Sequence, residues 1–294
     1  MSTTIVQAFS TLKQNLEITS LQAETVSTRQ ASVRKVVEAG MTVLDSFLTG
    51  SYSRSTMIAP LKEADVDILV VLNSKYFHQY DANAAGSQAG LLDAMRRVLL
   101  KTYTRTPDIS RNGQAVTIRF DDFLVDVVPA FMRPGGGYLI PNSISRSWVA
   151  TDPKKHVEIM SAANKVHDGQ LVPLVKMIKA WNKAHGKYFR SFHLEVLAMQ
   201  ILTGVTISDF PSALRFFFDK ARTAVTQKNL DPSGYGGDVG SYINTRESID
   251  EAVKKLQWAY DTAVRAEEAA ARGRIRDAME LWSRLLGDYV PAYG

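Results

Sequence analysis

The apolar residues at the start of the chain recur at helical spacing. Ile5, Phe9, Leu12 and Leu16 form a first run with intervals of three or four positions. A second run starts at about Leu21 and contains these apolar residues: Val26, Val33, Val36, Val37, Val43, Leu44, Phe47 and Leu48. Ser20 suits the N-cap of this run, and Gly50 lies beyond its end. We therefore predict helix through residue 48.

After residue 50 the pattern changes to one typical of strands. Residues 64–72, ADVDILVVL, become apolar on both faces and predict a buried strand. Residues 116–120 and 123–128 alternate around Asp121 and Asp122, which predicts a hairpin with these two as turn residues. Three further segments complete this part, namely a loop at 83–88, a helix at 91–102 and a turn at 134–137.

From His156 onward the apolar spacing is helical again. We predict helices at 171–185, 191–205, 248–273 and 274–286, with a glycine-rich loop at 231–240. The fold class is therefore α+β, a small mixed sheet with flanking helices followed by an all-helical half. We place the boundary near residues 150–167 and expect domains at 1–160 and 161–294.

Composition narrows the chemistry. Hydrophobic residues make up 45% and charged residues 22%, as in ordinary soluble globular proteins. The chain has no cysteine and only five scattered histidines, so disulfides and thiolate or zinc sites are not expected. A metal would then be a hard cation on oxygen ligands. The net charge of +5 indicates solubility, with a local basic cleft for triphosphates as the alternative.

Three aspartates occupy positions where a strand would normally carry other side chains. Asp65 and Asp67 are two apart on the first strand, so both point to one face. Asp126 lies within an otherwise apolar strand, where a carboxylate is costly unless it is paired or metal-bound. If the two strands are neighbours, three carboxylates meet, as two-metal phosphoryl transfer requires. The alternative for Asp65 and Asp67 is a pair of solvated charges on an edge strand.

A glycine–serine element precedes the first aspartate. Gly50 permits close backbone approach, and backbone N–H groups with the Ser51 hydroxyl would cradle the β- and γ-phosphates. Arg54 would add positive charge, and a plain connector is the alternative. Residues 135–137, Gly-Gly-Gly, lack a following Lys-Ser/Thr and open no helix, so we predict a hairpin turn there rather than a phosphate loop.

These residues together resemble a known superfamily. Gly50-Ser51, the Asp65-Val-Asp67 pair some fourteen residues later and the distant Asp126 resemble the nucleotidyltransferase fold of DNA polymerase β. The longer segments are similar to the CD-NTases, bacterial relatives of cyclic GMP-AMP synthase and oligoadenylate synthase: GSYSRSTMIAPLKEADVDILVVL, DFLVDVVPAF, WVATDP, LVKMIKAWN and LLGDYVP. The resemblance covers most of the chain. It implies a polymerase-β-like core and a C-terminal helical domain that completes the nucleotide-binding cleft.

The resemblance also implies nucleotide-binding roles. Lys179, two residues before Trp181, would reach the triphosphate, and Lys176 is the other candidate. Ser191 would touch phosphate and Phe192 would stack on the donor base. The alternatives are a solvated lysine at 179 and core packing at 192.

Two neighbours in the same segment have structural readings instead. Glu195 would be a buried structural carboxylate rather than a catalyst, and we give His193 a structural interpretation as well.

The implied mechanism uses two Mg²⁺ or Mn²⁺ ions. Asp65 and Asp67 would bind the ion that neutralises the triphosphate, and a second ion shared with Asp126 would lower the pKa of the acceptor hydroxyl. Asp126 is the candidate proton acceptor. The hydroxyl attacks the α-phosphorus, pyrophosphate leaves, and a further round on the linear intermediate closes a ring.

The implied function is synthesis of a cyclic di- or trinucleotide second messenger from NTPs, ATP among them, in anti-phage defence of the CBASS type. The product would act on an effector. We expect a cytoplasmic bacterial protein that acts as a monomer and needs no membrane. No apolar run approaches the ~20 residues that span a membrane, and no signal-peptide core starts the chain. No Cys/His zinc insertion is present, so we expect no activation by DNA. The bases, linkages, ring size and trigger are left open.

Two other functions fit the same residues. The first is a nucleotidyltransferase that acts on RNA ends or on a small-molecule acceptor, although the lack of a strongly basic tract argues against a tRNA substrate. The second is a non-catalytic nucleotide-binding protein on the same scaffold, which the intact set of three aspartates opposes.

Overall fold

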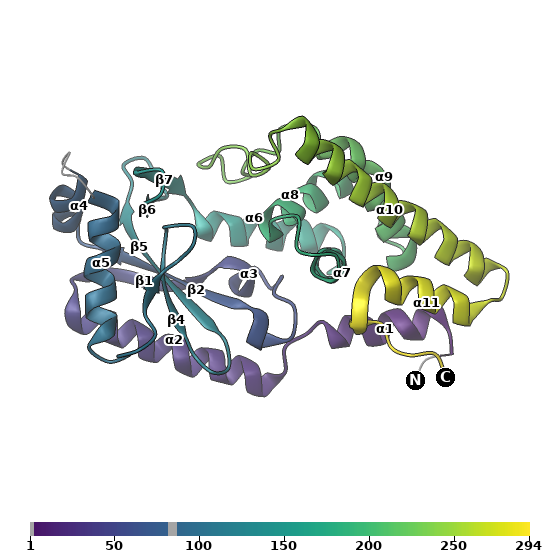
Figure 1. Cartoon of the computed structure of the whole chain (residues 1–294), viewed down its shortest axis with the longest axis horizontal. Coiled ribbons are helices and arrows are strands. Elements are labelled where there is room, and N and C mark those ends of the chain that lie inside the picture. The colour runs from purple at the N-terminus through teal and green to yellow at the C-terminus, as the bar shows by residue number, and fades with distance from the viewer. Residues whose placement is uncertain (1–2, 82–86) are drawn as a thin grey trace. The chain divides into compact units, whose positions relative to one another are not determined.

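A computed structural model describes residues 3–81 and 87–294, and every structural statement below refers to those residues (Figure 1). The chain divides into two compact units. Residues 18–157 form one, here called the sheet unit; residues 1–17, as far as they are described, and 158–294 form the other, here called the helical unit.

The sheet unit contains the strands and the helices that pack on them. Its elements are α2 (Ser20–Gly40), β1 (Val43–Thr49), α3 (Gly50–Ser53), the 3₁₀ turn η1 (Leu61–Glu63), β2 (Asp65–Leu72), α4 (Ser74–Asp81), α5 (Ser87–Leu100), β3 (Asp108–Ile109), β4 (Val116–Arg119), β5 (Leu124–Met132), β6 (Tyr138–Asn142) and β7 (Ser147–Thr151).

The helical unit contains helices at both ends of the sequence. Its elements are α1 (Ile5–Asn15), α7 (Leu171–Ala184), α8 (Ser191–Leu202), α9 (Phe210–Ala224), α10 (Arg246–Ala271), α11 (Ile275–Leu286) and the 3₁₀ turn η2 (Gly287–Tyr289). Helix α6 (Pro153–Val166) runs across the division between the units.

The strands described form one mixed sheet. Their order is β1-β2-β5-β4-β3, and β6 and β7 extend from the far end of β5. Strand β2 pairs with β5 in parallel, whereas β1 with β2 and β4 with β5 are antiparallel. The parallel pair joins residues that are 59 positions apart in sequence (126 − 67 = 59), so the hairpin at 116–128 lies next to the strand at 65–72.

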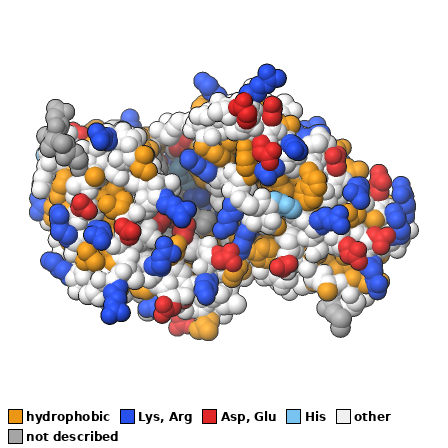
Figure 2. Space-filling model, viewed as in Figure 1, with side chains coloured by type: hydrophobic (Ala, Val, Ile, Leu, Met, Phe, Trp, Pro, Cys, Tyr) orange, Lys and Arg blue, Asp and Glu red, His pale blue; other side chains and the backbone are white. Residues whose placement is uncertain are grey.

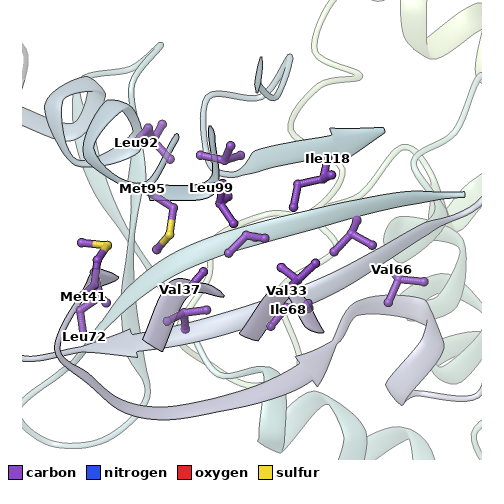
Figure 3. Packing of buried hydrophobic residues seen from close by; sticks show 14 of the residues in the cluster. Val33, Val37, Met41, Val66, Ile68, Leu72, Leu92, Met95, Leu99 and Ile118 are labelled. Carbon is purple, nitrogen blue, oxygen red and sulfur yellow. The ribbon is translucent and has the colours of Figure 1, made fainter. Parts of the chain in front are cut away.

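One face of the sheet packs on α2 and α5. Figure 3 shows Val33 and Val37 of α2 beside Ile68 of β2, and Met95 of α5 and Val66 of β2 belong to the same cluster. Side chains alternate along a strand, so the intervening residues of β2 and β5 point to the opposite face. That alternation puts the aspartates of both strands on the face away from the helices.

The opposite face carries a hydrophobic cluster along part of the strands. Leu69 and Val71 of β2, with Ala130 of β5, pack there against Tyr138 of β6. This second, smaller cluster lies toward the C-terminal halves of β2 and β5. The N-terminal halves of the same two strands carry the aspartates.

The helical unit has its own core, which includes the N-terminal helix. The rings of Phe9 in α1 and Trp282 in α11 meet edge to face at 5.0 Å, and Asn15 Nδ2 donates to the Tyr289 carbonyl at 2.9 Å. Helix α1 thus packs with the C-terminal helices. The compact units therefore differ from the expected division at residue 160, because the apolar stripe of α1 is buried against α11 and not on the sheet.

Helix α10 is the longest helix described, and its burial is one-sided. Alanines and Leu256 line the buried side, whereas ion pairs such as Lys255–Glu251 lie on the other. No helix among the described residues combines the length and apolar character that crossing a bilayer requires.

The prediction of helix through residue 48 is wrong. Helix α2 ends at Gly40, and residues 43–49 form β1, which hydrogen-bonds along the edge of β2. Ser20 is the first helical residue, and Thr19 is the N-cap, with a capping box to Gln22. Gly50 opens the one-turn helix α3 instead of following a long helix.

The other predicted elements are confirmed within a few residues. These are the strand at 64–72, the hairpin at 116–128, the turn at 134–137, the loop at 231–240 and the helices at 91–102, 171–185, 191–205, 248–273 and 274–286. Of the predicted loop at 83–88, residues 83–86 lie outside the described residues, and Ser87 and Gln88 begin α5. Helices α3, α4 and α9 and strands β3, β6 and β7 were not predicted.

Candidate active site

The register of the sheet places three carboxylates on one face. Asp67 of β2 is the direct partner of Asp126 of β5 in the parallel pair, and Asp65 precedes Asp67 by two residues. On the other side of Asp126, Thr117 of β4 is its direct antiparallel partner. Neighbouring strands lie about 4.8 Å apart, so the side chains of this row are in reach of one another.

Gly50 lies against Asp67. Strand β1 ends at Thr49, which pairs with Asp67 itself, and Gly50 then turns the chain with a φ of +68°. A Cβ atom at Gly50 would lie 1.8 Å from Asp67 Oδ2. The position therefore demands glycine for two reasons, its left-handed backbone and the close approach of a carboxylate.

Ser51 and Arg54 flank the same turn. The Ser51 carbonyl accepts hydrogen bonds from Thr56 N at 2.9 Å and Met57 N at 3.1 Å, which ties α3 to the segment leading into β2. Arg54 is half-buried and caps the C-terminal end of α3, where its N–H donates to Gly50 O at 3.3 Å. Gly50, Ser51 and Arg54 thus follow directly on the C-terminal end of β1, where Thr49 pairs with Asp67.

Asp126 is held in a poorly hydrated position. Burial raises the pKa of its carboxyl group above the ordinary value, and the hydrogen bond from Thr117 counteracts part of that rise. Thr117 Oγ1 donates this bond to Asp126 Oδ1 at 2.5 Å. A desolvated carboxylate gains most from a nearby cation, so Asp126 suits a metal-binding role.

The donor set fits a hard divalent cation. Three carboxylates from adjacent strands offer the oxygen ligands that Mg²⁺ and Mn²⁺ prefer. Within the described part of the chain, no three acidic or histidine side chains are already gathered tightly enough to hold an ion. Asp126 Oδ1 accepts a hydrogen bond from Thr117 Oγ1, and Asp67 Oδ2 lies against Gly50.

Lys179 and Lys176 lie in α7 of the helical unit, and both are buried in ion pairs. Lys179 Nζ lies 2.7 Å from Glu195 Oε1 of α8, with exposed side-chain fractions of 5% and 0%. Lys176 Nζ lies 2.6 Å from Glu17 Oε2. The reading of Lys179 as a solvated lysine is therefore wrong. The buried carboxylate expected at Glu195 is confirmed, and its partner is the lysine expected to reach the triphosphate.

Ser191 and Phe192 begin helix α8. Ser191 is exposed and Phe192 is partly exposed, so Phe192 is not a fully buried core residue. Lys179, Ser191 and Phe192 thus lie on α7 and α8 of one unit. The aspartates and the Gly50 turn belong to the other unit.

His193 has a structural environment. Its Nδ1 lies 3.0 Å from the Tyr242 hydroxyl, which also accepts a hydrogen bond from Arg190 N at 2.8 Å. Burial lowers the pKa of His193 to about 4, although Asp238 opposes the shift. The imidazole is therefore neutral near pH 7, and Tyr242 fastens the start of α8 to the segment after the glycine-rich loop.

The sequence reasoning missed Thr117 and Tyr242. A threonine in an alternating strand is typical of any sheet. Only the strand register shows that Thr117 lies next to Asp126 and can hydrogen-bond to it. Tyr242 lies some fifty residues from its partners, and no spacing rule connects them.

Comparison with known proteins adds a family. Residues 1–164 match the family described as Second Messenger Oligonucleotide or Dinucleotide Synthetase domain, SMODS. That match covers more than half of the chain and includes Gly50, Ser51 and all three aspartates.

Two named relatives are similar over most of their length. A probable cyclic nucleotide synthase of Bacillus cereus is 26% identical over 276 residues, which cover 83% of this chain and 81% of that protein. A cyclic AMP-AMP-AMP synthase of an Acinetobacter species is 27% identical over 264 residues, 84% of this chain and 72% of that protein.

A solved structure has the same fold. The structure of Escherichia coli CdnC with ATP aligns with a TM-score of 0.75 at 17% identity, and the alignment covers 97% of this chain and 98% of that one. At this identity the likeness concerns the fold, which is a nucleotidyltransferase core followed by a helical region.

Proposed function

Because the chain belongs to the SMODS family, the Second Messenger Oligonucleotide or Dinucleotide Synthetase domain proteins, we propose that it joins NTPs into a cyclic di- or trinucleotide and releases pyrophosphate. The expected resemblance to the CD-NTases agrees with this membership. One observation carries the proposal: Asp67 and Asp126 are register partners on adjacent strands, with Asp65 on the same face and the Gly50 turn against them.

The residues of the sheet unit have two roles in the proposal, binding of the donor phosphates and acceptance of the proton. The turn at Gly50 and Ser51 binds the β- and γ-phosphates of the donor, and Arg54 adds positive charge beside it. Asp126 lies on the far side of Asp67 from that turn, where it takes the proton of the acceptor hydroxyl. When two Mg²⁺ or Mn²⁺ ions are bound by Asp65, Asp67 and Asp126, they supply the charge neutralisation that phosphoryl transfer requires.

The residues of α7 and α8 bind the donor nucleotide in the proposal. Lys179 supplies positive charge to the triphosphate, Ser191 donates a hydrogen bond to phosphate, and the partly exposed Phe192 stacks on the base. Glu195 holds the Lys179 ammonium in place through its buried ion pair.

We propose ATP as one substrate and a signalling role for the product. Support comes from the relative named as a cyclic AMP-AMP-AMP synthase and from the CdnC structure with ATP. The cyclic product would act on an effector protein in anti-phage defence.

Product analysis tests the reaction. Purified protein with Mg²⁺ and an equimolar mixture of the four NTPs should give a phosphatase-resistant cyclic oligonucleotide, identified by mass spectrometry. The D65A/D67A variant should lose at least about 1,000-fold of this activity, because both phosphate-neutralising ligands are gone. Asp121→Ala, an exposed turn residue, is the matched control. Only linear product, or undiminished activity in D65A/D67A, would reject the proposal.

Metal binding is tested without turnover. Titration of the protein with Mn²⁺, followed by electron paramagnetic resonance, should show bound ion in the wild type and much weaker binding in Asp67→Asn. Equal Mn²⁺ affinity in both proteins would remove Asp67 from the metal site.

A further inference from the structure

A basic recess lies at the β3–β4 edge of the sheet unit, beyond the aspartate row. Its volume is about 320 Å³, and Arg96, Arg105 and Arg119 line it together with the hydroxyl-bearing Thr106 and Thr117. Arg105 and Arg119 are exposed, and Arg96 is half-buried, with its Nε donating to the Pro107 carbonyl at 2.8 Å. The recess thus has one guanidinium held in place and two at its rim.

Thr117 connects the recess to the candidate active site. It lines the recess, and its Oγ1 donates to Asp126 Oδ1. Along the sheet, Asp67, Asp126, Thr117 and Asp108 are successive register partners on β2, β5, β4 and β3. A molecule whose hydroxyl reaches Asp126 therefore has the recess next to it, one strand further from Asp67.

The order of strands separates two sides of Asp126. The turn at Gly50 lies on the β1–β2 side, beside Asp67. The recess lies on the β4–β3 side, beside Thr117. Donor phosphates bound by the turn and a ligand in the recess would thus flank Asp126 from opposite directions.

The lining selects phosphate over a nucleobase. Arginine binds phosphate oxygens through two parallel N–H groups, and the threonine hydroxyls add donors. None of the described lining residues is aromatic, so no stacking surface for a base is present. The volume is at the small end of ligand sites, which span roughly 300–1,000 Å³. Asp108 is the one acidic group in the lining, against three arginines.

We propose that this recess binds the 5′-phosphates of the acceptor nucleotide, or of the growing linear intermediate, while its ribose hydroxyl lies at Asp126. The inference rests on the proposed function, since it assigns the acceptor side of the same site. It makes Arg105 and Arg119 determinants of acceptor choice, and it requires that a phosphorylated acceptor be preferred over a nucleoside.

A single-transfer assay isolates this preference. The donor is 2′,3′-dideoxyATP, which has no hydroxyl to accept with, and the acceptors are α,β-methylene-ATP, which cannot donate, and adenosine. We expect the wild type to show a KM for α,β-methylene-ATP about tenfold or more below that for adenosine, as two charge-assisted contacts provide. In R105A/R119A this ratio should fall below about threefold, with the kinetic constants for adenosine unchanged.

The control is R97A/R111A, which removes the same charge from two exposed arginines outside the recess. It should keep the wild-type preference. An unchanged preference in R105A/R119A overturns the proposal, as does an equal loss with both acceptors. Relief of pyrophosphate inhibition without a change in preference also overturns it, because the recess would then hold the released product.

A binding measurement separates this proposal from the proposed function. Calorimetric titration of metal-free protein with tripolyphosphate should show binding that R105A/R119A weakens about tenfold or more. If the wild type transfers nothing from any NTP yet shows this difference, the anion site stands and the assignment to an acceptor fails. Equal tripolyphosphate binding by both proteins overturns the site itself.

Discussion

Two independent constraints, one of the backbone and one of the neighbouring carboxylate, require glycine at position 50. Its φ of +68° is unfavourable for any residue with a side chain, and the space a Cβ would need is occupied by the Asp67 carboxylate. Glycine here therefore lets an acidic group lie against the backbone of the turn that we propose to bind phosphate.

Substitution of Gly50 tests this directly. Gly50→Ala should lower the rate of product formation about 100-fold or more, because a misplacement of about 1 Å at a catalytic group costs that much. The control is Gly135→Ala, since Gly135 has a φ of +84° and nothing within 4 Å of the added Cβ. It should incur a similar strain of about 1 kcal/mol and retain its activity. Equal activity of the two variants would contradict the argument.

His193 makes the stability of the helical unit sensitive to acid. Its pKa is 6.5 when unfolded and about 4 in the folded protein. Between these values only the unfolded chain takes up the proton. The contribution of neutral His193 to the free energy of unfolding is therefore fully present above pH 6.5 and is lost as the pH falls toward 4. The loss amounts to about 2 kcal/mol between pH 7 and pH 5.

The measurement is urea denaturation of the wild type and His193→Asn at both pH values. The amide oxygen of asparagine can accept the Tyr242 hydrogen bond but does not titrate, so the variant should lose about 2 kcal/mol less on acidification. Asp238 and Arg190, the charges that act on His193, are the same in both proteins. Parallel pH dependence would show that other groups cause the acid sensitivity.

Among the elements, α7 and α8 are joined by a buried ion pair. Glu195→Leu leaves the Lys179 ammonium in the interior without its carboxylate, and we expect a loss of about 3–5 kcal/mol of unfolding free energy. K179M/E195L should recover most of that loss, because no isolated charge remains. Denaturant unfolding measures both variants, and a double variant as unstable as Glu195→Leu would contradict the coupling.

An exposed pair provides the contrast. Arg246 and Asp250 lie 3.9 Å apart on α10, with side chains 92% and 73% exposed. Asp250→Ala should change stability by less than about 0.5 kcal/mol.

The elements also show where sequence reasoning succeeds. The aspartate-bearing strand, the hairpin and the long C-terminal helices were predictable because their apolar periodicity is unambiguous. Val43, Leu44, Phe47 and Leu48 are spaced as on a helix and continue the stripe of α2, yet they form β1 because pairing with β2 satisfies their backbone. Local spacing does not contain that partner.

The site was predictable in part for the same reason. Asp65, Asp67 and Asp126 stand out as acids in apolar strands, and the register confirms that they are neighbours. Thr117 and the arginines of the recess do not stand out, since threonine in a strand and arginine on a surface are ordinary. Only the three-dimensional order of β5, β4 and β3 relates them to Asp126.

At the scale of the whole molecule, the net charge is small, and positive and negative side chains are mixed on the face that Figure 2 shows. Figure 2 shows Lys and Arg side chains interspersed with Asp and Glu over the visible face. This agrees with the modest net charge of +5. Binding of anions must then depend on local groups such as the recess, and not on a general positive field.

Helix α1 belongs to the same compact unit as the C-terminal helices, and substitutions in α1 test this organisation. Phe9→Ala should cost about 3–5 kcal/mol through loss of its contact with Trp282. Hydrogen exchange should quicken in α11 and remain nearly unchanged in β2. Val6→Ala on the same helix is the control, because Val6 is 82% exposed. Faster exchange in β2 and not in α11 would assign α1 to the sheet unit.

The parallel pairing of β2 with β5 has a consequence for folding fidelity. If one of the two strands slipped by one residue, every side chain of that strand would change faces, and its aspartate side chains would enter the hydrophobic core beneath α2 and α5. An ionised carboxylate there has no partner and is strongly disfavoured. The aspartates that the chemistry requires therefore also disfavour a shifted register of β2 against β5. Replacing them with apolar residues would make the shifted pairing less unfavourable.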